Sequence, residues 1–105
     1  MNNEKIQQLQ TIEQNLQSFL TQKQQLQQEL LEVDSSIEEL SKTDKAYKIV
    51  GSIMISSNKE DLSKELEIKK DIVEQKLKII QQQEDKIKEK AETLRKEVMD
   101  EMKQE

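Results

Sequence analysis

Apolar residues recur through the first forty positions at alternating steps of three and four, which is the spacing of a coiled-coil seam. Polar residues, mainly Gln and Glu, fill the positions between them. Nothing between Asn3 and Ser41 breaks a helix, so the pattern predicts one helix of about 40 residues and about 60 Å. A helix this polar is weak alone and needs a partner along its length. The seam consists of Leu9, Ile12, Leu16, Phe19, Lys23, Leu26, Leu30, Val33, Ile37 and Leu40.

A second seam of the same kind follows position 58, where Ser57 or Asn58 can cap the helix start. An antiparallel pairing of the two helices places Leu9 against Leu94 and Leu30 against Val73. Three polar seam residues, Lys23, Lys70 and Glu84, are expected to lay their stems on apolar partners and carry their charges outward. The second seam consists of Leu66, Lys70, Val73, Leu77, Ile80, Glu84, Ile87, Ala91, Leu94 and Val98.

Residues 46–57 are the one stretch that does not favour helix, because they are rich in β-branched residues and contain the single glycine. We predict a β-hairpin that turns at Gly51-Ser52, with Val50 opposite Ile53 and Ile49 opposite Met54. Apolar groups then reach both faces, and an isolated hairpin is marginal in water. The segment is therefore interpreted as an assembly element, with a plug folded onto its own helices as the alternative. The assembly residues are Tyr47, Ile49, Val50, Gly51, Ile53, Met54 and Ile55.

Composition narrows the possible functions. The chain has 105 residues, of which 32% are hydrophobic and 37% charged, so a sizeable private core is not expected. A net charge of -5 and a pI near 4.9 argue against nucleic acid, since phosphate binding needs a basic surface. No apolar run approaches the roughly 18 residues of a membrane span, so we expect no membrane partner and a cytoplasmic location.

Catalytic chemistry has no candidate residues in this sequence. It has no His, no Cys and no phosphate-cradling glycine loop, and its Ser residues have no base to activate them. We therefore expect no enzyme activity, no catalytic residue, no cofactor and no metal site.

Apolar residues near the two ends of the chain lack a full set of partners in the predicted pairing. Met99 and Met102 lie where the partner helix runs out, and unbranched Met suits a surface that accepts many shapes. Frayed ends with scattered hydrophobic residues are an equally good interpretation. If the terminal turns splay apart, Leu9 and Leu94 are exposed as well.

The whole pattern resembles a β-class prefoldin subunit. The resemblance covers nearly all of the chain, including the Ser52-Ile53-Met54-Ile55 return strand and the acidic helix start at Asn58-Lys59-Glu60-Asp61. It is most specific at Tyr47-Lys48-Ile49-Val50-Gly51, at the centre of the helical hairpin. The β class has one hairpin between its helices, as here, and the short termini favour an archaeal-type member. The return strand differs from the Leu- and Val-rich versions of the family but keeps its apolar character.

The resemblance implies a fold, a function and a set of partners. The fold is mainly α, a long antiparallel two-helix coiled coil with one central β-hairpin that joins an intersubunit β-barrel. The function is that of a hexameric, ATP-independent chaperone of two α-class and four β-class subunits, which holds unfolded client proteins at its coiled-coil tips and passes them to a group II chaperonin. The client-contact candidates are Ile6, Leu9, Ile12, Leu94, Val98, Met99 and Met102.

We expect a single domain over residues 1–105, with helices at 1–43 and 58–103 around the hairpin at 46–57. The competing interpretation is a structural coiled-coil scaffold or tether that dimerises through its seam. It explains the heptads but gives no reason for the apolar hairpin.

Overall fold

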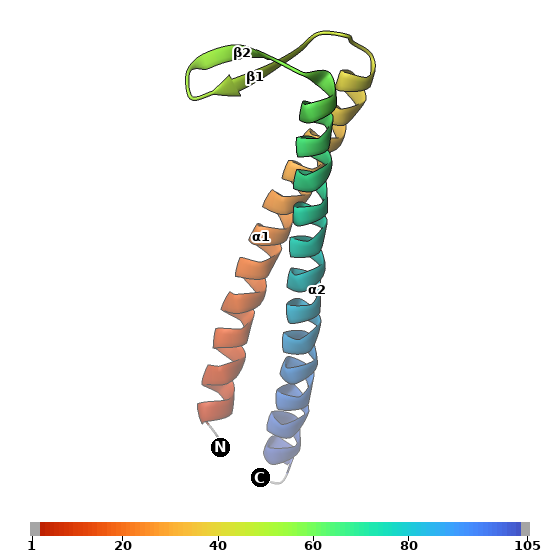
Figure 1. Cartoon of the computed structure of the whole chain (residues 1–105). Coiled ribbons are helices and arrows are strands. Elements are labelled where there is room, and N and C mark those ends of the chain that lie inside the picture. Colours follow the sequence, from red (N-terminus) through yellow and green to blue (C-terminus); the bar gives the residue numbers. More distant parts are fainter. Residues whose placement is uncertain (1–2, 104–105) are drawn as a thin grey trace. The chain divides into compact units, whose positions relative to one another are not determined.

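The structure, a computed structural model, describes residues 3–103, in the order helix, hairpin, helix (Figure 1). The elements are α1 (Asn3–Ser41), β1 (Ala46–Val50), β2 (Ile53–Ser57) and α2 (Lys59–Lys103). The predicted fold class of two long helices around one antiparallel hairpin is confirmed. Helix α1 ends two residues before the expected position 43, and positions 1–2 and 104–105 of the expected domain lie outside the described residues.

The chain divides into two compact parts, each containing a segment of both helices. The terminal unit comprises residues 1–25 and 78–105, described at 3–25 and 78–103, and the hairpin unit comprises residues 26–77. In each unit the two helix segments run side by side in opposite directions (Figure 1).

The core of the terminal unit is a small apolar cluster of Ile12, Ala91 and Leu94. Leu9, Leu16 and Ile87 pack against it, as expected from the predicted antiparallel pairing. The core of the hairpin unit contains Val33, Leu40 and Val73, of which Val73 is the most deeply buried. Every heptad position predicted for either seam is buried or half-buried, so the 3-4 spacing correctly identified the packed face of both helices.

The polar seam residues behave differently from one another. Lys70 carries its charge to the edge of the seam, where its Nζ lies 3.0 Å from a carboxylate oxygen of Asp34. That ion pair raises the pKa of Lys70, chiefly through its hydrogen bond to Asp34. The outward orientation expected for Glu84 is wrong, because only 4% of this residue is exposed.

Glu84 is held in the seam by donors from both helices. Its carboxylate accepts hydrogen bonds from Lys88 Nζ at 3.1 Å, Lys23 Nζ at 3.2 Å and Gln81 Nε2 at 3.4 Å. Lys23 Nζ also donates to Gln81 Oε1 at 3.0 Å. The charge of Lys23, which was expected to reach water, is therefore hydrogen-bonded to two residues of α2. The hydrogen bond from Lys88, followed by that from Lys23, lowers the pKa of Glu84. A buried carboxylate is tolerated here because it is multiply paired.

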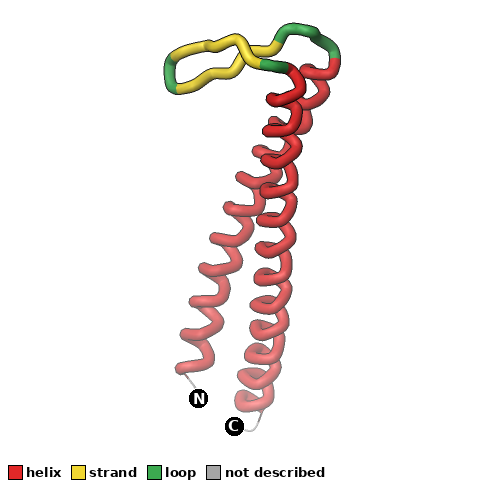
Figure 2. Tube along the Cα trace, viewed as in Figure 1, coloured by secondary structure: helices red, strands yellow, loops and turns green. Residues whose placement is uncertain are grey.

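The hairpin, whose two strands are yellow in Figure 2, has the predicted antiparallel arrangement. Its register is also as predicted, with Val50 opposite Ile53 and Ile49 opposite Met54. Gly51 has a φ of 64°, and no non-glycine residue among positions 3–103 has a positive φ. A positive φ confined to the first central residue is the requirement of the glycine-led two-residue turn. The helix that follows is capped by Asn58, whose Oδ1 accepts a hydrogen bond from the Glu60 backbone N–H at 2.8 Å.

Candidate functional site

The first candidate surface is the hairpin itself, whose apolar side chains are exposed on both faces. Ile49 is 69% exposed and Met54, its cross-strand neighbour, 65%. Val50 and Ile53 form an exposed pair on the opposite face. We call this set the hairpin surface; it contains Tyr47, Ile49, Val50, Gly51, Ile53, Met54 and Ile55.

The alternative prediction, that the hairpin is a plug folded onto its own helices, is wrong. Of strand β1 only Ala46 is buried, and no residue of β2 is. The two strands also form the whole of their sheet, so each strand has one edge without a ladder partner among residues 3–103. Apolar faces together with open strand edges are the features that other chains can complete.

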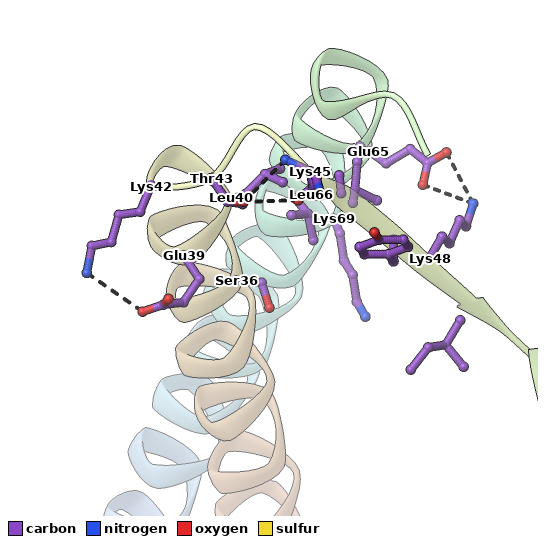
Figure 3. Close-up of a pocket in the computed structure, with 14 residues that line it drawn as sticks. Ser36, Glu39, Leu40, Lys42, Thr43, Lys45, Lys48, Glu65, Leu66 and Lys69 are labelled. Carbon is purple, nitrogen blue, oxygen red and sulfur yellow. Dashed lines mark hydrogen bonds and ion pairs between the residues drawn. The ribbon is translucent and has the colours of Figure 1, made fainter. Parts of the chain in front are cut away.

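Where the hairpin leaves the helices, the hairpin unit contains a groove of about 920 Å³ (Figure 3). Tyr47 and Ile49 line it from β1, and Leu62, Leu66 and Lys69 line it from α2. An ion pair joins β1 to α2 at this groove: Lys48 Nζ lies 3.0 and 3.2 Å from the two Glu65 carboxylate oxygens.

Several polar groups of this groove have structural roles. Thr43 Oγ1 accepts a hydrogen bond from the Lys45 backbone N–H at 3.2 Å and so shapes the turn before β1. Lys42 directly follows α1, and its Nζ lies 3.6 Å from a Glu38 carboxylate oxygen and 3.7 Å from one of Glu39 in the last turn of that helix. Within the described part of the chain no cluster of acidic residues has the arrangement of a metal site. The groove therefore offers a shaped surface for contact and no assembled reactive group.

The second candidate surface lies at the chain ends of the terminal unit. The seven client-contact candidates predicted there differ in their exposure and form two groups. Met99 and Met102 are each 58% exposed. Val98 of the same helix and Ile6 of α1 are half-buried. Ile12 and Leu94, in contrast, belong to the buried cluster, and Leu9 packs against it. We call Ile6, Val98, Met99 and Met102 the tip surface.

An ion-pair cluster joins the helices next to the tip surface. Lys5 Nζ lies 2.6 Å from Glu101 and 3.3 Å from Glu97. The hydrogen bond to Glu101 is the main reason that the pKa of Lys5 is raised. These side chains are accessible to water, so the cluster orients the terminal turns more than it stabilises them.

Several exposed apolar residues lie outside both predicted seams and were not singled out from the sequence. The sequence does contain a signal for them. Among the residues that do not belong to a seam, a few Leu and Ile residues lie on otherwise polar helix faces. Those with large exposed side chains are Leu20, Leu31, Ile68, Ile72 and Ile79. Across residues 3–103, neither helix has a stretch long and apolar enough to cross a membrane.

Comparison with known proteins gives a consistent result across the chain. A family model described as "Prefoldin subunit" matches residues 3–105. The chain is 42% identical to a prefoldin subunit beta of Archaeoglobus fulgidus over 93 residues, covering 85% of this chain and 80% of that protein. It is 39% identical to a prefoldin subunit beta of Pyrococcus furiosus over 90 residues, covering 83% of this chain and 77% of that protein.

A solved structure agrees with these sequence relatives. The crystal structure of the prefoldin beta subunit from a Thermococcus strain matches this structure with a TM-score of 0.87 at 30% identity, covering 93% of this chain and 89% of that one. The two structures share a fold of two long helices with a single β-hairpin between them. The chain therefore belongs to the prefoldin family, as a chaperone subunit of the β class.

Proposed function

We propose that this chain is one of four β-class subunits that assemble with two α-class subunits into a hexameric chaperone. Assembly uses the hairpin surface, whose strands join those of other subunits in a β-barrel. The tip surface holds unfolded client proteins without ATP hydrolysis and releases them to a group II chaperonin in the cytosol. The family relationship supports a chaperone role and a protein that is not an enzyme.

One observation supports the proposal most strongly. The heptad seams are packed within the chain, whereas two other sets of apolar side chains have no such packing partner among the described residues. All seam positions are at least half-buried, so the helices do not need a further partner along the seam. The hairpin surface and the two methionines of the tip surface stay open to water. A scaffold that dimerises through its seam would show the reverse distribution of exposure.

The exposed tip side chains support weak and multivalent capture. Complete burial of one such side chain is worth roughly 1.5–3 kcal/mol at most, so a single tip holds a client poorly. Several tips that act on one client raise the effective concentration and give retention with ready release.

Assembly can be tested first, with the full-length chain and an α-class subunit. The Ile49→Asp variant places a charge in the hairpin surface, where Ile49 is 69% exposed in the isolated chain, so folding of the helices should be unaffected. We expect loss of the complex in native mass spectrometry with an unchanged helical signal in circular dichroism. The control is Leu31→Asp, on an α1 residue that is 64% exposed and outside the hairpin surface.

Client capture is then tested on complexes whose assembly has been verified. A chemically unfolded protein is diluted into ATP-free buffer with complex containing the wild-type chain, Met99→Gln/Met102→Gln, or Leu31→Gln as the control. We expect the wild type and the control to suppress light scattering and the double Met variant to suppress it poorly. Equal suppression by all three would refute the assigned tip surface, and no suppression by any of them would favour a scaffold.

A further inference from the structure

Helix α2 carries three exposed isoleucines that neither the seam nor the tip surface uses, and two of them, Ile68 and Ile72, lie in the hairpin unit. Ile68 is 60% exposed and Ile72 is 48% exposed. Their spacing of four places them on one face of the helix, one turn apart. We call this pair the flank patch.

The flank patch lies on the face of α2 from which the hairpin departs. Lys48 of β1 reaches Glu65 at 3.0 Å, and Glu65 precedes Ile68 and Ile72 by three and seven residues, which are spacings of a single helix face. Lys69, which lines the groove together with Tyr47 and Ile49, is one turn before Ile72. Figure 3 shows Lys48, Glu65 and Lys69 together at this junction.

The flank patch therefore continues the apolar side of the hairpin onto the helix. Tyr47 and Ile49 line the groove together with Glu65 and Lys69. Ile68 and Ile72 lie on the adjoining face of α2, by their helical spacing from these two residues. Glu65 is paired with Lys48, which partly offsets the charge of this carboxylate next to the flank patch. Two exposed isoleucines alone would be ordinary for a surface, but their continuity with an apolar hairpin face is not.

We propose that the flank patch is covered by the β-hairpin of a neighbouring prefoldin subunit, so that the subunit interface extends from the hairpin onto α2. This inference rests on the proposed assembly through the hairpin surface. A neighbour's hairpin is the occupant that fits, because it can pair with an open strand edge of β1 or β2 while its apolar face covers Ile68 and Ile72.

Site-specific labelling tests the inference, because the chain has no cysteine and a single introduced thiol reports one position. We would compare Ile68→Cys and Ile72→Cys with Leu31→Cys, which replaces a similarly exposed residue of α1. Each is labelled with a maleimide in the free chain and in the purified complex with an α-class subunit. We expect labelling at 68 and 72 to slow on the order of tenfold in the complex, and labelling at 31 to stay unchanged.

The identity of the occupant needs a second measurement. A photo-crosslinker attached to Ile68→Cys should give crosslinked peptides from a neighbouring subunit's hairpin. Crosslinks only to helices of the neighbour, or protection that appears only after an unfolded client is added, would overturn the proposed occupant.

The two proposals fail in distinguishable ways. If the wild-type chain forms the complex and Ile49→Asp disrupts it, but positions 68 and 72 label as fast as in the free chain, only the flank-patch inference is wrong. If the wild-type chain forms no complex with an α-class subunit, the proposed assembly fails and the inference fails with it.

Discussion

Replacing Glu84 by Gln removes the charge at the centre of the one buried polar network in the described seams. The carboxylate is 4% exposed and bonds to Lys23 and Lys88 at 3.2 and 3.1 Å. Gln keeps the size of the side chain and one acceptor oxygen, so the change tests the charge and not the packing. The matched control is Glu92→Gln, which removes an exposed charge from the same helix.

The magnitude follows from the environments of the two lysines. Hydrogen bonds to charged groups contribute about 1.5–3 kcal/mol each when both partners are shielded. The Lys88 side chain is largely exposed, so its share falls within the roughly 0–1 kcal/mol of surface pairs. Lys23 is better shielded, and loss of the carboxylate leaves its ammonium without its anion. We expect Glu84→Gln to destabilise the chain by about 2 kcal/mol and Glu92→Gln by less than about 0.5 kcal/mol.

The same substitution has a defined pH dependence. The pKa of Glu84 is lowered in the folded chain, so the folded state binds this proton less readily than the unfolded state. The contribution of the Glu84 charge to folding stability is therefore complete above the pKa of about 4.3 that Glu has in the unfolded chain. It is lost as the pH falls through the lower pKa of the folded chain. The difference in unfolding free energy between the wild type and Glu84→Gln should therefore be constant near neutral pH and decrease toward zero in acid.

Urea denaturation followed by far-ultraviolet circular dichroism measures both quantities, at one fixed protein concentration since assembly would couple to unfolding. Equal stability of the wild type and Glu84→Gln at neutral pH would refute the assigned network. A difference that stays the same in acid would show that packing, and not the charge, is responsible.

Two further predictions concern the turn and the tip. Gly51→Ala should cost about 1–2 kcal/mol of hairpin stability, seen as faster hydrogen exchange in β1 and β2, because φ is 64° while nothing lies within 4 Å of the added Cβ. Unchanged exchange there would contradict the strained turn. The terminal turns should splay and expose Leu9 and Leu94 transiently, so amides at 3–9 and 94–103 should exchange faster than those around Val33 and Val73. Equally slow exchange at both places would rule out splaying.

The local features of this fold could be predicted because they depend on neighbours in the chain. The 3-4 spacing that includes Val33 and Val73 identified the buried face of each helix, since a helix presents such positions along one stripe. The glycine at position 51 determined the turn, and the turn then determined the strand register. The sequence favoured an exposed hairpin, because apolar residues lie on both faces of its two strands, but the structure was needed to exclude a hairpin folded onto its own helices.

The sequence alone thus determined the element order, the seams, the register of the hairpin and the resemblance to a family. The tertiary structure decided the features that depend on residues far apart in the sequence. It brought Lys23 to Glu84 and buried a charge expected to face water, and it packed Ile12 and Leu94 together and so removed them from the exposed tip. It also joined Lys48 of the hairpin to Glu65 of α2 and left Ile68 and Ile72 of the same helix exposed. Periodicity assigns a residue to a face, but only the distance between two helices and a hairpin decides whether a charge finds a partner or an apolar group stays open to water.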